Sequence, residues 1–141
     1  PLHLFFSGRG GPSVQDKDKD IHALPKKEFI KKLQEYEGSP QEILNDESIM
    51  EFFEPVLRAD FKAVSNYPYN EDTPFNIPIT VMIGTTENTT YEEAMKWQDE
   101  TSKEISLRQF PGGHFFIYQH SQEIGRIFSH TLQHFLEIIS D

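Results

Sequence analysis

The sequence predicts an α/β fold built on a parallel sheet, and two observations support this prediction. Short apolar runs with strand character recur at residues 2–6, 77–83 and 105–110. Segments with helical spacing separate and follow these runs, and such alternation is typical of a parallel sheet covered by helices. A sheet of three strands leaves its edge strands unpaired. It also offers too little surface for helices to cover both of its faces. We therefore expect an incomplete parallel sheet.

The first strand is expected at residues 2–6, where a continuous apolar run meets the glycine-rich turn at residues 7–12. A chain that begins directly with a core strand, and without an initiator Met, is unusual. We therefore expect a fragment. Its sheet would be completed by upstream polypeptide or by self-association across an exposed strand edge.

Residues 21–66 have helical spacing and predict a small helical subdomain. The first helix should end at Gly38 and carry apolar residues on one face. These residues are Phe29, Leu33 and Tyr36. The second helix should begin with a capping box from Ser39 to Glu42, with Pro40 in its first turn.

The third helix of this subdomain should begin at Asp46, which can cap its first turn. Apolar residues then recur at intervals of three or four and predict a long apolar stripe. They are Met50, Phe53, Leu57, Phe61 and Val64. Pro55 lies within this stripe and should kink or break the helix, because proline lacks the backbone donor.

Residues 67–141 return to alternating strands and helices. The strand at 77–83 begins near Pro78 and ends at Gly84. A capping box of Thr90 and Glu93 opens a helix that should run to about Ser102. After the strand at 105–110, a last helix should begin at about Gln122 with an apolar inner face. That face comprises Ile124, Ile127, Phe128, Phe135, Ile138 and Ile139.

Composition excludes several functional classes. A formal net charge of −10, without a basic stripe, disfavours nucleic acid as a partner. The apolar runs are too short to cross a membrane, and no secretory segment is evident. The chain has no cysteine, which excludes disulfides, thiolate catalysis and cysteine metal sites. We expect a cytoplasmic protein, since a chain without disulfides suits a reducing compartment.

One basic cluster stands out in this acidic chain. It comprises Lys26, Lys27, Lys31 and Lys32, whose spacing gathers four ammonium groups around the start of one helix. A solvated helix face is one interpretation. Docking of an acidic protein partner is the other, because electrostatic steering depends on the local potential.

The candidate chemistry lies where two of the expected strands end. Gly112 and Gly113 follow the strand at 105–110 and can turn His114 out at its carboxyl end, where α/β folds place their sites. Glu87 follows Gly84 at the same end of the preceding strand. A carboxylate and an imidazole could meet there, as they do in serine hydrolases with the chain order Ser, Asp or Glu, His.

Metal sites are not expected. The alternating Asp16, Asp18 and Asp20 lack the glycine and the glutamate of a calcium loop. His130 and His134 lie one helical turn apart, but no third zinc ligand is evident.

Several sequence strings resemble the type II thioesterases that accompany nonribosomal peptide and polyketide synthases. The likeness covers nearly the whole chain, and two of its strings are specific in combination: Leu-Arg-Ala-Asp-Phe at 57–61 and Gly-Gly-His-Phe-Phe at 112–116. Further strings lie at 4–9, 21–25, 38–42 and 78–81, together with Pro12, Phe29 and Trp97. The resemblance implies an α/β-hydrolase fold in which residues 21–66 form a lid over an acyl channel.

The resemblance also implies site roles. His114 would be the general base, and Glu87 would occupy the position where the family usually has Asp. Glutamate is one methylene longer, so Asn88 and Glu92 are the fallback partners. The expected activity is hydrolysis of acyl or aminoacyl thioesters on the phosphopantetheine arm of a carrier protein, with no cofactor and no metal.

The sequence departs from the family in one important respect, because it contains no Gly-x-Ser-x-Gly nucleophile turn. Ser7 is no substitute, since its surroundings match a later strand end. We therefore expect the nucleophile outside this chain and no activity from the 141 residues alone. Two alternatives remain: an α/β-hydrolase esterase acting on free esters, and a non-catalytic domain that binds carrier proteins.

Overall fold

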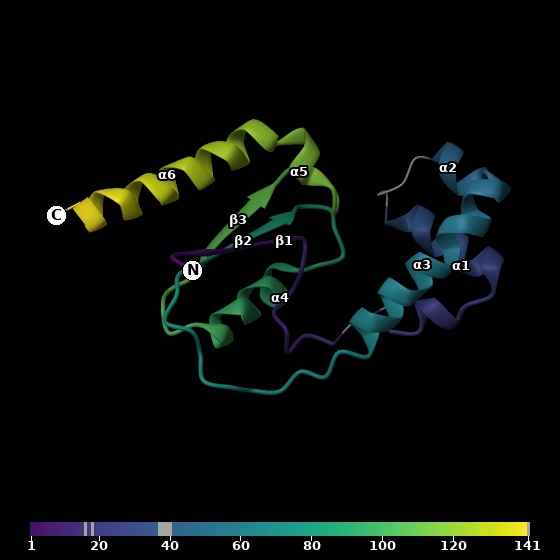
Figure 1. Ribbon diagram of the computed structural model, residues 1–141, viewed down its shortest axis with the longest axis horizontal. Coiled ribbons are helices and arrows are strands. Elements are labelled where there is room, and N and C mark those ends of the chain that lie inside the picture. The colour runs from purple at the N-terminus through teal and green to yellow at the C-terminus, as the bar shows by residue number, and fades with distance from the viewer. Residues whose placement is uncertain (16, 18, 37–40, 141) are drawn as a thin grey trace. The chain divides into compact units, whose positions relative to one another are not determined.

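The computed structural model describes residues 1–15, 17, 19–36 and 41–140, which divide into two compact units (Figure 1). The sheet unit comprises Pro1–Gly11 and Thr73–Asp141. The helical unit comprises Pro12–Asp72. Each unit has buried apolar clusters of its own, so each is described by itself. Among the described residues, no helix is both long and apolar enough to cross a bilayer.

The sheet unit is built on three parallel strands in the order β1-β2-β3, which confirms the predicted α/β class. The strands are β1 (Leu4–Ser7), β2 (Ile79–Gly84) and β3 (Ser106–Phe110). Val81 of β2 is in register with Phe6 on one side and with Leu107 on the other. The central strand is buried along its whole length, as expected for a continuous apolar run in a parallel sheet.

Helices cover both faces of this sheet (Figure 1). The first face packs on α4 (Tyr91–Met95) and the 3-10 helix η2 (Lys96–Glu100), through Ala94 and Trp97. The opposite face packs on α5 (Phe116–Gln119) and α6 (Ser121–Ser140), through Phe116 and Ile124. The result is a three-layer arrangement, in which alternate residues of β2 point to opposite helical layers.

The predicted elements of the sheet unit are present with small shifts at their ends. The capping box of Thr90 and Glu93 is confirmed, with the Glu93 amide 3.2 Å from Thr90 Oγ1. The helix predicted to about Ser102 is shorter: its α-helical part ends at Met95. The Gln98 side chain bonds the backbone of Thr101, Lys103 and Ile105, and this favours a tight turn into β3 over a longer helix.

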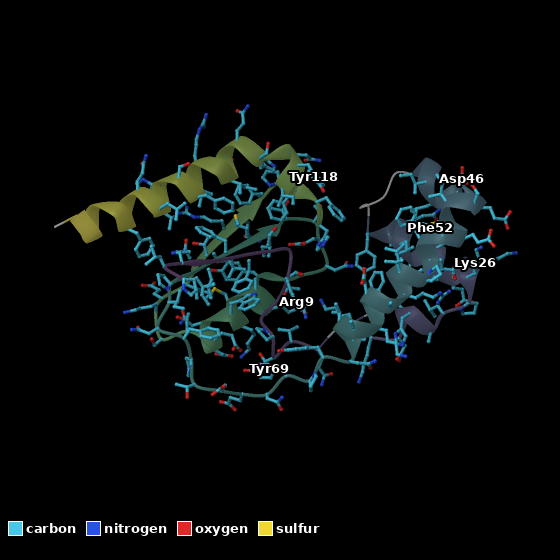
Figure 2. The ribbon with its side chains drawn as sticks, viewed as in Figure 1. Arg9, Lys26, Asp46, Phe52, Tyr69 and Tyr118 are labelled. Atoms are coloured by element: carbon cyan, nitrogen blue, oxygen red, sulfur yellow. The ribbon has the colours of Figure 1, made fainter. Side chains whose placement is uncertain are left out.

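The helical unit contains a 3-10 turn and three α-helices among its described residues. They are η1 (Ile21–Ala23), α1 (Lys26–Glu35), α2 (Gln41–Asn45) and α3 (Glu47–Ser65). Phe29 and Met50 are buried in its core. Asp46 caps α3 as predicted, because its Oδ1 accepts the amides of Ser48 and Ile49 at 3.0 and 3.1 Å (Figure 2). Gly38, Ser39 and Pro40 lie outside the described residues, as does the side chain of Glu42.

The sequence predicts a kink or a break of α3 at Pro55, and the structure excludes the break. The helix is not broken at Pro55 but continues to Ser65. Glu51, whose carbonyl would have bonded a residue at position 55, is exposed, so water can satisfy that group. The five residues of the predicted apolar stripe all lie on α3, and the stripe is partly buried: Phe53 and Val64 remain 48% and 42% exposed. Met50, Leu57 and Phe61 are the stripe residues that pack into the core of the helical unit.

Arg58 connects several parts of the helical unit. Its guanidinium bonds Glu54 at 2.8 Å and the carbonyl oxygen of His22 at 2.7 Å, and it lies 4.2 Å from the centre of the Phe29 ring. These contacts confirm the expectation that Arg58 does not pair with Asp60, two residues along the helix.

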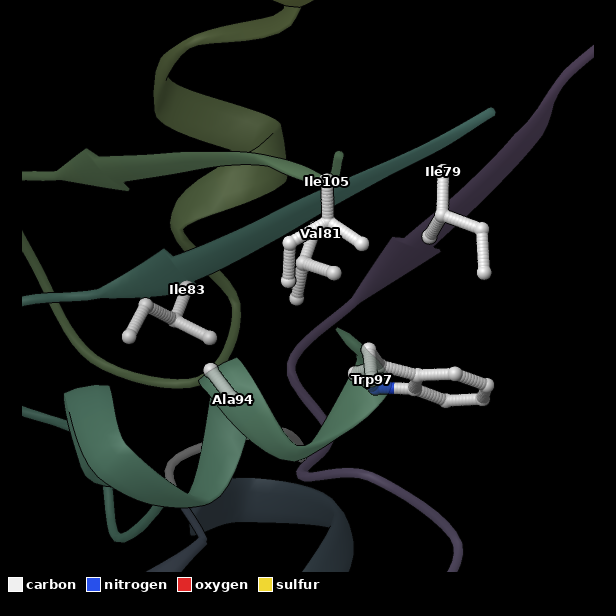
Figure 3. Close-up of a cluster of buried hydrophobic side chains, with 6 residues drawn as sticks. All are labelled: Ile79, Val81, Ile83, Ala94, Trp97 and Ile105. Carbon is white, nitrogen blue, oxygen red and sulfur yellow. The ribbon is translucent and has the colours of Figure 1, made fainter. Parts of the chain in front are cut away.

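The buried cluster on the first face of the sheet fixes the position of Trp97. The cluster comprises Ile79, Val81, Ile83, Ala94, Trp97 and Ile105 (Figure 3). Trp97 stacks on Phe6 with ring centroids 3.6 Å apart. Its indole nitrogen donates to the Arg9 carbonyl at 3.0 Å. Trp97 is therefore a packing residue that also holds the turn after β1.

Candidate active site

Three turns meet at one edge of the sheet because the three strands are parallel. Gly8 follows β1, residues 85–87 follow β2, and residues 111–114 follow β3. Carboxyl ends of parallel strands are the usual location of sites in α/β folds. The candidate residues Glu87 and His114 therefore lie at the edge where the sequence predicts them.

Hydrogen bonds join the turn after β2 to the turn after β3. The Thr85 amide donates to the Phe110 carbonyl at 2.9 Å, and the Thr86 amide donates to the Gly112 carbonyl at 3.0 Å. Gly84 makes this approach possible, because a Cβ atom there would lie 2.5 Å from the carbonyl oxygens of Gly112 and Gly113. The two turns consequently form one supported structure.

Glu87 is buried at the base of the site. Its side chain is 1% exposed, and its Oε1 accepts the Gly84 amide at 2.8 Å. Its Oε2 lies 3.0 Å from His114 Nδ1. The longer glutamate side chain thus reaches the imidazole, with its second oxygen fixed by the backbone.

The bond to Glu87 sets the orientation and the proton position of the His114 ring. A carboxylate oxygen accepts a hydrogen bond from a protonated Nδ1, and in the neutral ring with that tautomer Nε2 keeps its lone pair. The His114 side chain is 42% exposed, and the Phe115 ring meets it edge-on at 5.0 Å. Nε2 therefore lies on the side of the ring away from Glu87, where it can accept a proton from a reacting group.

The other candidate residues are placed less favourably. Asn88 and Glu92, the fallback partners, are exposed, and Glu87 occupies Nδ1 of the imidazole. Ser7 is the exposed last residue of β1, and the chain does not enter a helix directly after it. The next described element after β1 is η1, which begins at Ile21.

Candidate metal ligands do not gather in the described residues. No cluster of three His, Asp or Glu side chains with a metal-binding arrangement occurs among them. His130 is exposed on α6, whereas the side chain of His134, together with Asp16 and Asp18, lies outside the described part of the chain.

The glycine-rich segment at 7–12, predicted only to be a turn, also contributes one residue to the site. Gly8 has a left-handed backbone with φ of +66°, and its Cα lies against the Glu87–His114 pair. The available signal was its place directly after a strand, at the same end of the sheet as the other two turns.

Comparison with known proteins places this chain in a family. The thioesterase domain model matches residues 1–133. The gramicidin S biosynthesis protein GrsT of Aneurinibacillus migulanus is 39% identical over 125 residues, which are 88% of this chain and 49% of that protein. The linear gramicidin dehydrogenase LgrE of Brevibacillus parabrevis is 33% identical over 140 residues, which are 96% of this chain and 53% of that protein.

A solved structure agrees with these matches. The type II thioesterase BorB from the borrelidin biosynthetic cluster superposes with a TM-score of 0.81 and 28% identity, over 93% of this chain and 54% of that one. The predicted resemblance to type II thioesterases and the α/β-hydrolase fold are thereby confirmed. The chain spans about half the length of the first curated relatives it matches.

Proposed function

The chain belongs to the thioesterase domain family, and from that premise we propose that it supplies the histidine and the carboxylate of a serine thioesterase. The observation that supports this most strongly is the Glu87–His114 pair, with Nδ1 and Oε2 3.0 Å apart at the carboxyl edge of a parallel sheet. The reaction is hydrolysis of acyl or aminoacyl thioesters carried on a phosphopantetheine arm.

In this mechanism His114 moves protons and Glu87 holds the imidazole. Nε2 takes the proton of a serine hydroxyl as its oxygen attacks the thioester carbonyl. The tetrahedral intermediate collapses, the C–S bond breaks, and Nε2 returns the proton to the leaving thiol. Water then attacks the serine ester through the same base, and this step releases the acid and restores the serine. Glu87 stabilises the imidazolium that forms in each half-reaction.

The serine is proposed to come from polypeptide outside residues 1–141. A nucleophile of this mechanism sits on a strand-turn-helix elbow with the pattern Gly-x-Ser-x-Gly, and that pattern is absent from this sequence. The chain by itself is therefore expected to hydrolyse no thioester. Turnover by the purified 141-residue chain would contradict this.

A carrier protein is the proposed partner, and the helical unit is the proposed lid and docking surface. Of the four α1 lysines, Lys26 lies 3.7 Å from Glu54 and Lys32 lies 2.8 Å from Glu35, so their charges are partly neutralised. Lys27 and Lys31 are exposed and remain the better candidates for meeting an acidic carrier. Replacing Lys27 and Lys31 by acidic residues, which reverses their charges, should slow association with the carrier and weaken the salt dependence of the association rate. Unchanged association would leave these lysines as a solvated surface.

A dehydrogenase role, which the name of LgrE suggests for that protein, is less well supported here. Dinucleotide binding needs a glycine-rich turn that leads from a strand directly into a helix, whose N-terminus meets the pyrophosphate. The turn after β1 is glycine-rich, but the described chain reaches its next helical element only at Ile21. The Glu87–His114 pair, in which a buried carboxylate meets a partly exposed imidazole, instead supports hydrolytic catalysis. The cytoplasmic location expected from the sequence remains a prediction.

The decisive experiment compares substrates on the protein that contains both this chain and a Gly-x-Ser-x-Gly turn. Acyl groups are offered on holo-carrier protein and as small free esters with the same acyl part. The proposal expects a higher kcat/KM for the carrier-bound thioester. Preference for free esters would favour an esterase. Carrier binding without turnover of either substrate would favour a non-catalytic binding domain.

A further inference from the structure

We propose that Gly8 is a positioning residue of this site, whose bare Cα is the surface on which the His114 imidazole rests while Nδ1 meets Glu87. The inference rests on the proposed function for its kinetic consequence only. Its geometric part concerns this chain alone and can be tested without any reaction.

The distances leave no room for a side chain at position 8. A Cβ atom built on Gly8 would lie 2.8 Å from His114 Cε1 and 2.9 Å from His114 Nδ1. The same atom would lie 3.5 Å from Glu87 Oε2, which is an ordinary contact. A methyl group at this position would therefore press on the imidazole and spare the carboxylate.

The turn that carries Gly8 cannot easily withdraw from the ring. The Gly8 amide donates to the Met82 carbonyl at 2.9 Å, which ties the turn to β2. The Arg9 carbonyl accepts from the Trp97 indole at 3.0 Å. The Gly11 amide donates to the Glu93 carbonyl at 2.9 Å. Strand β2 and the helical layer therefore both hold this turn.

The imidazole is the part that can move. Glu87 is 1% exposed and bonded to the Gly84 amide, whereas the His114 side chain is 42% exposed. A Cβ atom at position 8 would consequently push the ring outward and away from Oε2. The fold would lose little packing, but the ring would lose the bond that sets its tautomer and direction.

Two variants separate contact with the ring from backbone strain. Gly8 has φ of +66°, a conformation that alanine adopts reluctantly and asparagine adopts more readily. Both residues place a Cβ atom against His114. Gly8→Ala and Gly8→Asn should therefore disturb the pair alike, even though Gly8→Asn is the better tolerated by the backbone. Gly125→Ala is the matched control, because nothing lies within 4 Å of a Cβ atom there.

The first readout is the His114 ring in this chain, followed by proton and nitrogen NMR of the imidazole. The wild-type chain and Gly125→Ala should show a downfield, exchange-protected Nδ1 proton and the Nδ1-protonated tautomer. Gly8→Ala and Gly8→Asn should lose the protected proton while the amide spectrum of the sheet unit is retained. A protected Nδ1 proton in a folded Gly8→Asn chain would overturn the proposal, whatever the fate of Gly8→Ala.

The second readout is kinetic and uses the protein that also contains the nucleophile turn. A misplaced catalytic group costs about 100-fold, so kcat should fall by about that factor for both Gly8 variants while KM changes little. In a Glu87→Gln background, Gly8→Asn should cost much less, since the bond it disturbs is already lost. Full additivity of the two substitutions would contradict the positioning role.

Failure of this inference and failure of the proposed function give different results. If the protein that contains the nucleophile turn hydrolyses no thioester, but shows a protected Nδ1 proton that Gly8→Asn removes, the proposed function fails and the geometric role of Gly8 stands. If thioesters are hydrolysed and Gly8→Asn keeps both the proton signal and kcat, the role of Gly8 fails and the proposed function stands.

Discussion

The sheet unit brings together residues that are far apart in sequence, whereas the helical unit packs helices that are neighbours in sequence. In the sheet unit, the site gathers Gly8, Glu87 and His114 from three turns that are far apart in sequence. In the helical unit, the core packs neighbouring helices against one another, and Phe52, Phe53 and Val56 of α3 stay exposed. The parallel strands therefore bring the candidate site residues together, whereas the helical unit contributes a self-contained core and an exposed surface.

This difference can be tested by asking which substitutions affect the Glu87–His114 pair. Substitutions at the three turns should change the chemistry with little change in stability. Substitutions in the core of the helical unit should change stability and leave the pair intact.

Among substitutions of groups that support the catalytic histidine, the largest effect is expected at the carboxylate of Glu87. Glu87→Gln should lower kcat/KM of the nucleophile-containing protein by about 10³- to 10⁴-fold, since an amide can hold the ring in the wrong tautomer. Glu92→Gln is the control, because Glu92 is exposed at the start of α4. Steady-state kinetics on carrier-bound thioester would measure both. A large loss for Glu92→Gln with none for Glu87→Gln would make Glu92 the partner.

The next effect is expected in the core of the helical unit. Phe29 is 0% exposed, so Phe29→Ala should lower the free energy of unfolding of that unit by about 3–5 kcal/mol. Phe52 is 73% exposed, so Phe52→Ala should change it by about 0.5 kcal/mol or less. Urea unfolding measures the stability, and imidazole NMR should show an unchanged His114 tautomer in Phe29→Ala as well as in Phe52→Ala. Equal destabilisation by the two variants would argue against the observed core.

A smaller effect is expected at a helix cap of the sheet unit. Thr90 Oγ1 accepts the Glu93 amide, so Thr90→Ala should destabilise by about 1 kcal/mol. Thr90→Ser keeps the hydroxyl and serves as the control. Thermal unfolding of the two variants side by side provides the measurement, and an equal loss for serine and alanine would show that the hydroxyl is not the stabilising group.

The smallest effects are expected in the pH dependence, which should differ between the units. In the sheet unit, burial lowers the pKa of His3 from 6.5. As pH falls, His3 therefore binds its proton at a higher pH in the unfolded chain than in the folded chain. The stability should decrease as pH falls below 6.5 toward the pKa of His3 in the folded chain. His3→Gln should flatten this slope in thermal melts, and an unchanged slope would remove His3 as its cause.

In the helical unit, pH dependence should begin at lower pH. Hydrogen bonds from the Ser48 side chain and the Ile49 amide lower the pKa of Asp46 from 3.8. The stabilisation by the ionised Asp46 cap is therefore complete above pH 3.8. It is lost as pH falls through the pKa of Asp46 in the folded chain. Asp46→Asn keeps a capping oxygen that does not titrate, so its melts should lose that dependence. The same dependence in Asp46→Asn would assign it to another carboxylate.

Local rules explain what the sequence predicts correctly. The Asp46 cap and the Thr90–Glu93 capping box depend on residues within one helical turn, so spacing alone identifies them. The meeting of Glu87 with His114 follows from one further rule, that parallel strands end at a common edge.

Tertiary context explains what residue spacing could not predict. The exposure of Phe53 depends on how much of α3 its neighbours cover, which spacing cannot report. The helix passes Pro55 because the affected turn faces solvent. Gly8 was missed because its role depends on a ring 106 residues further along the chain.

The central claim, that His114 moves the proton for a serine in thioester hydrolysis, is tested most directly by the hydrolysis rate of a carrier-bound thioester. The measurement compares wild-type protein containing the nucleophile turn with its His114→Ala variant at equal folded concentration. The account predicts that kcat falls by about 10⁴-fold, the upper end for loss of general acid–base catalysis. A variant that hydrolyses the thioester at the wild-type rate would contradict it.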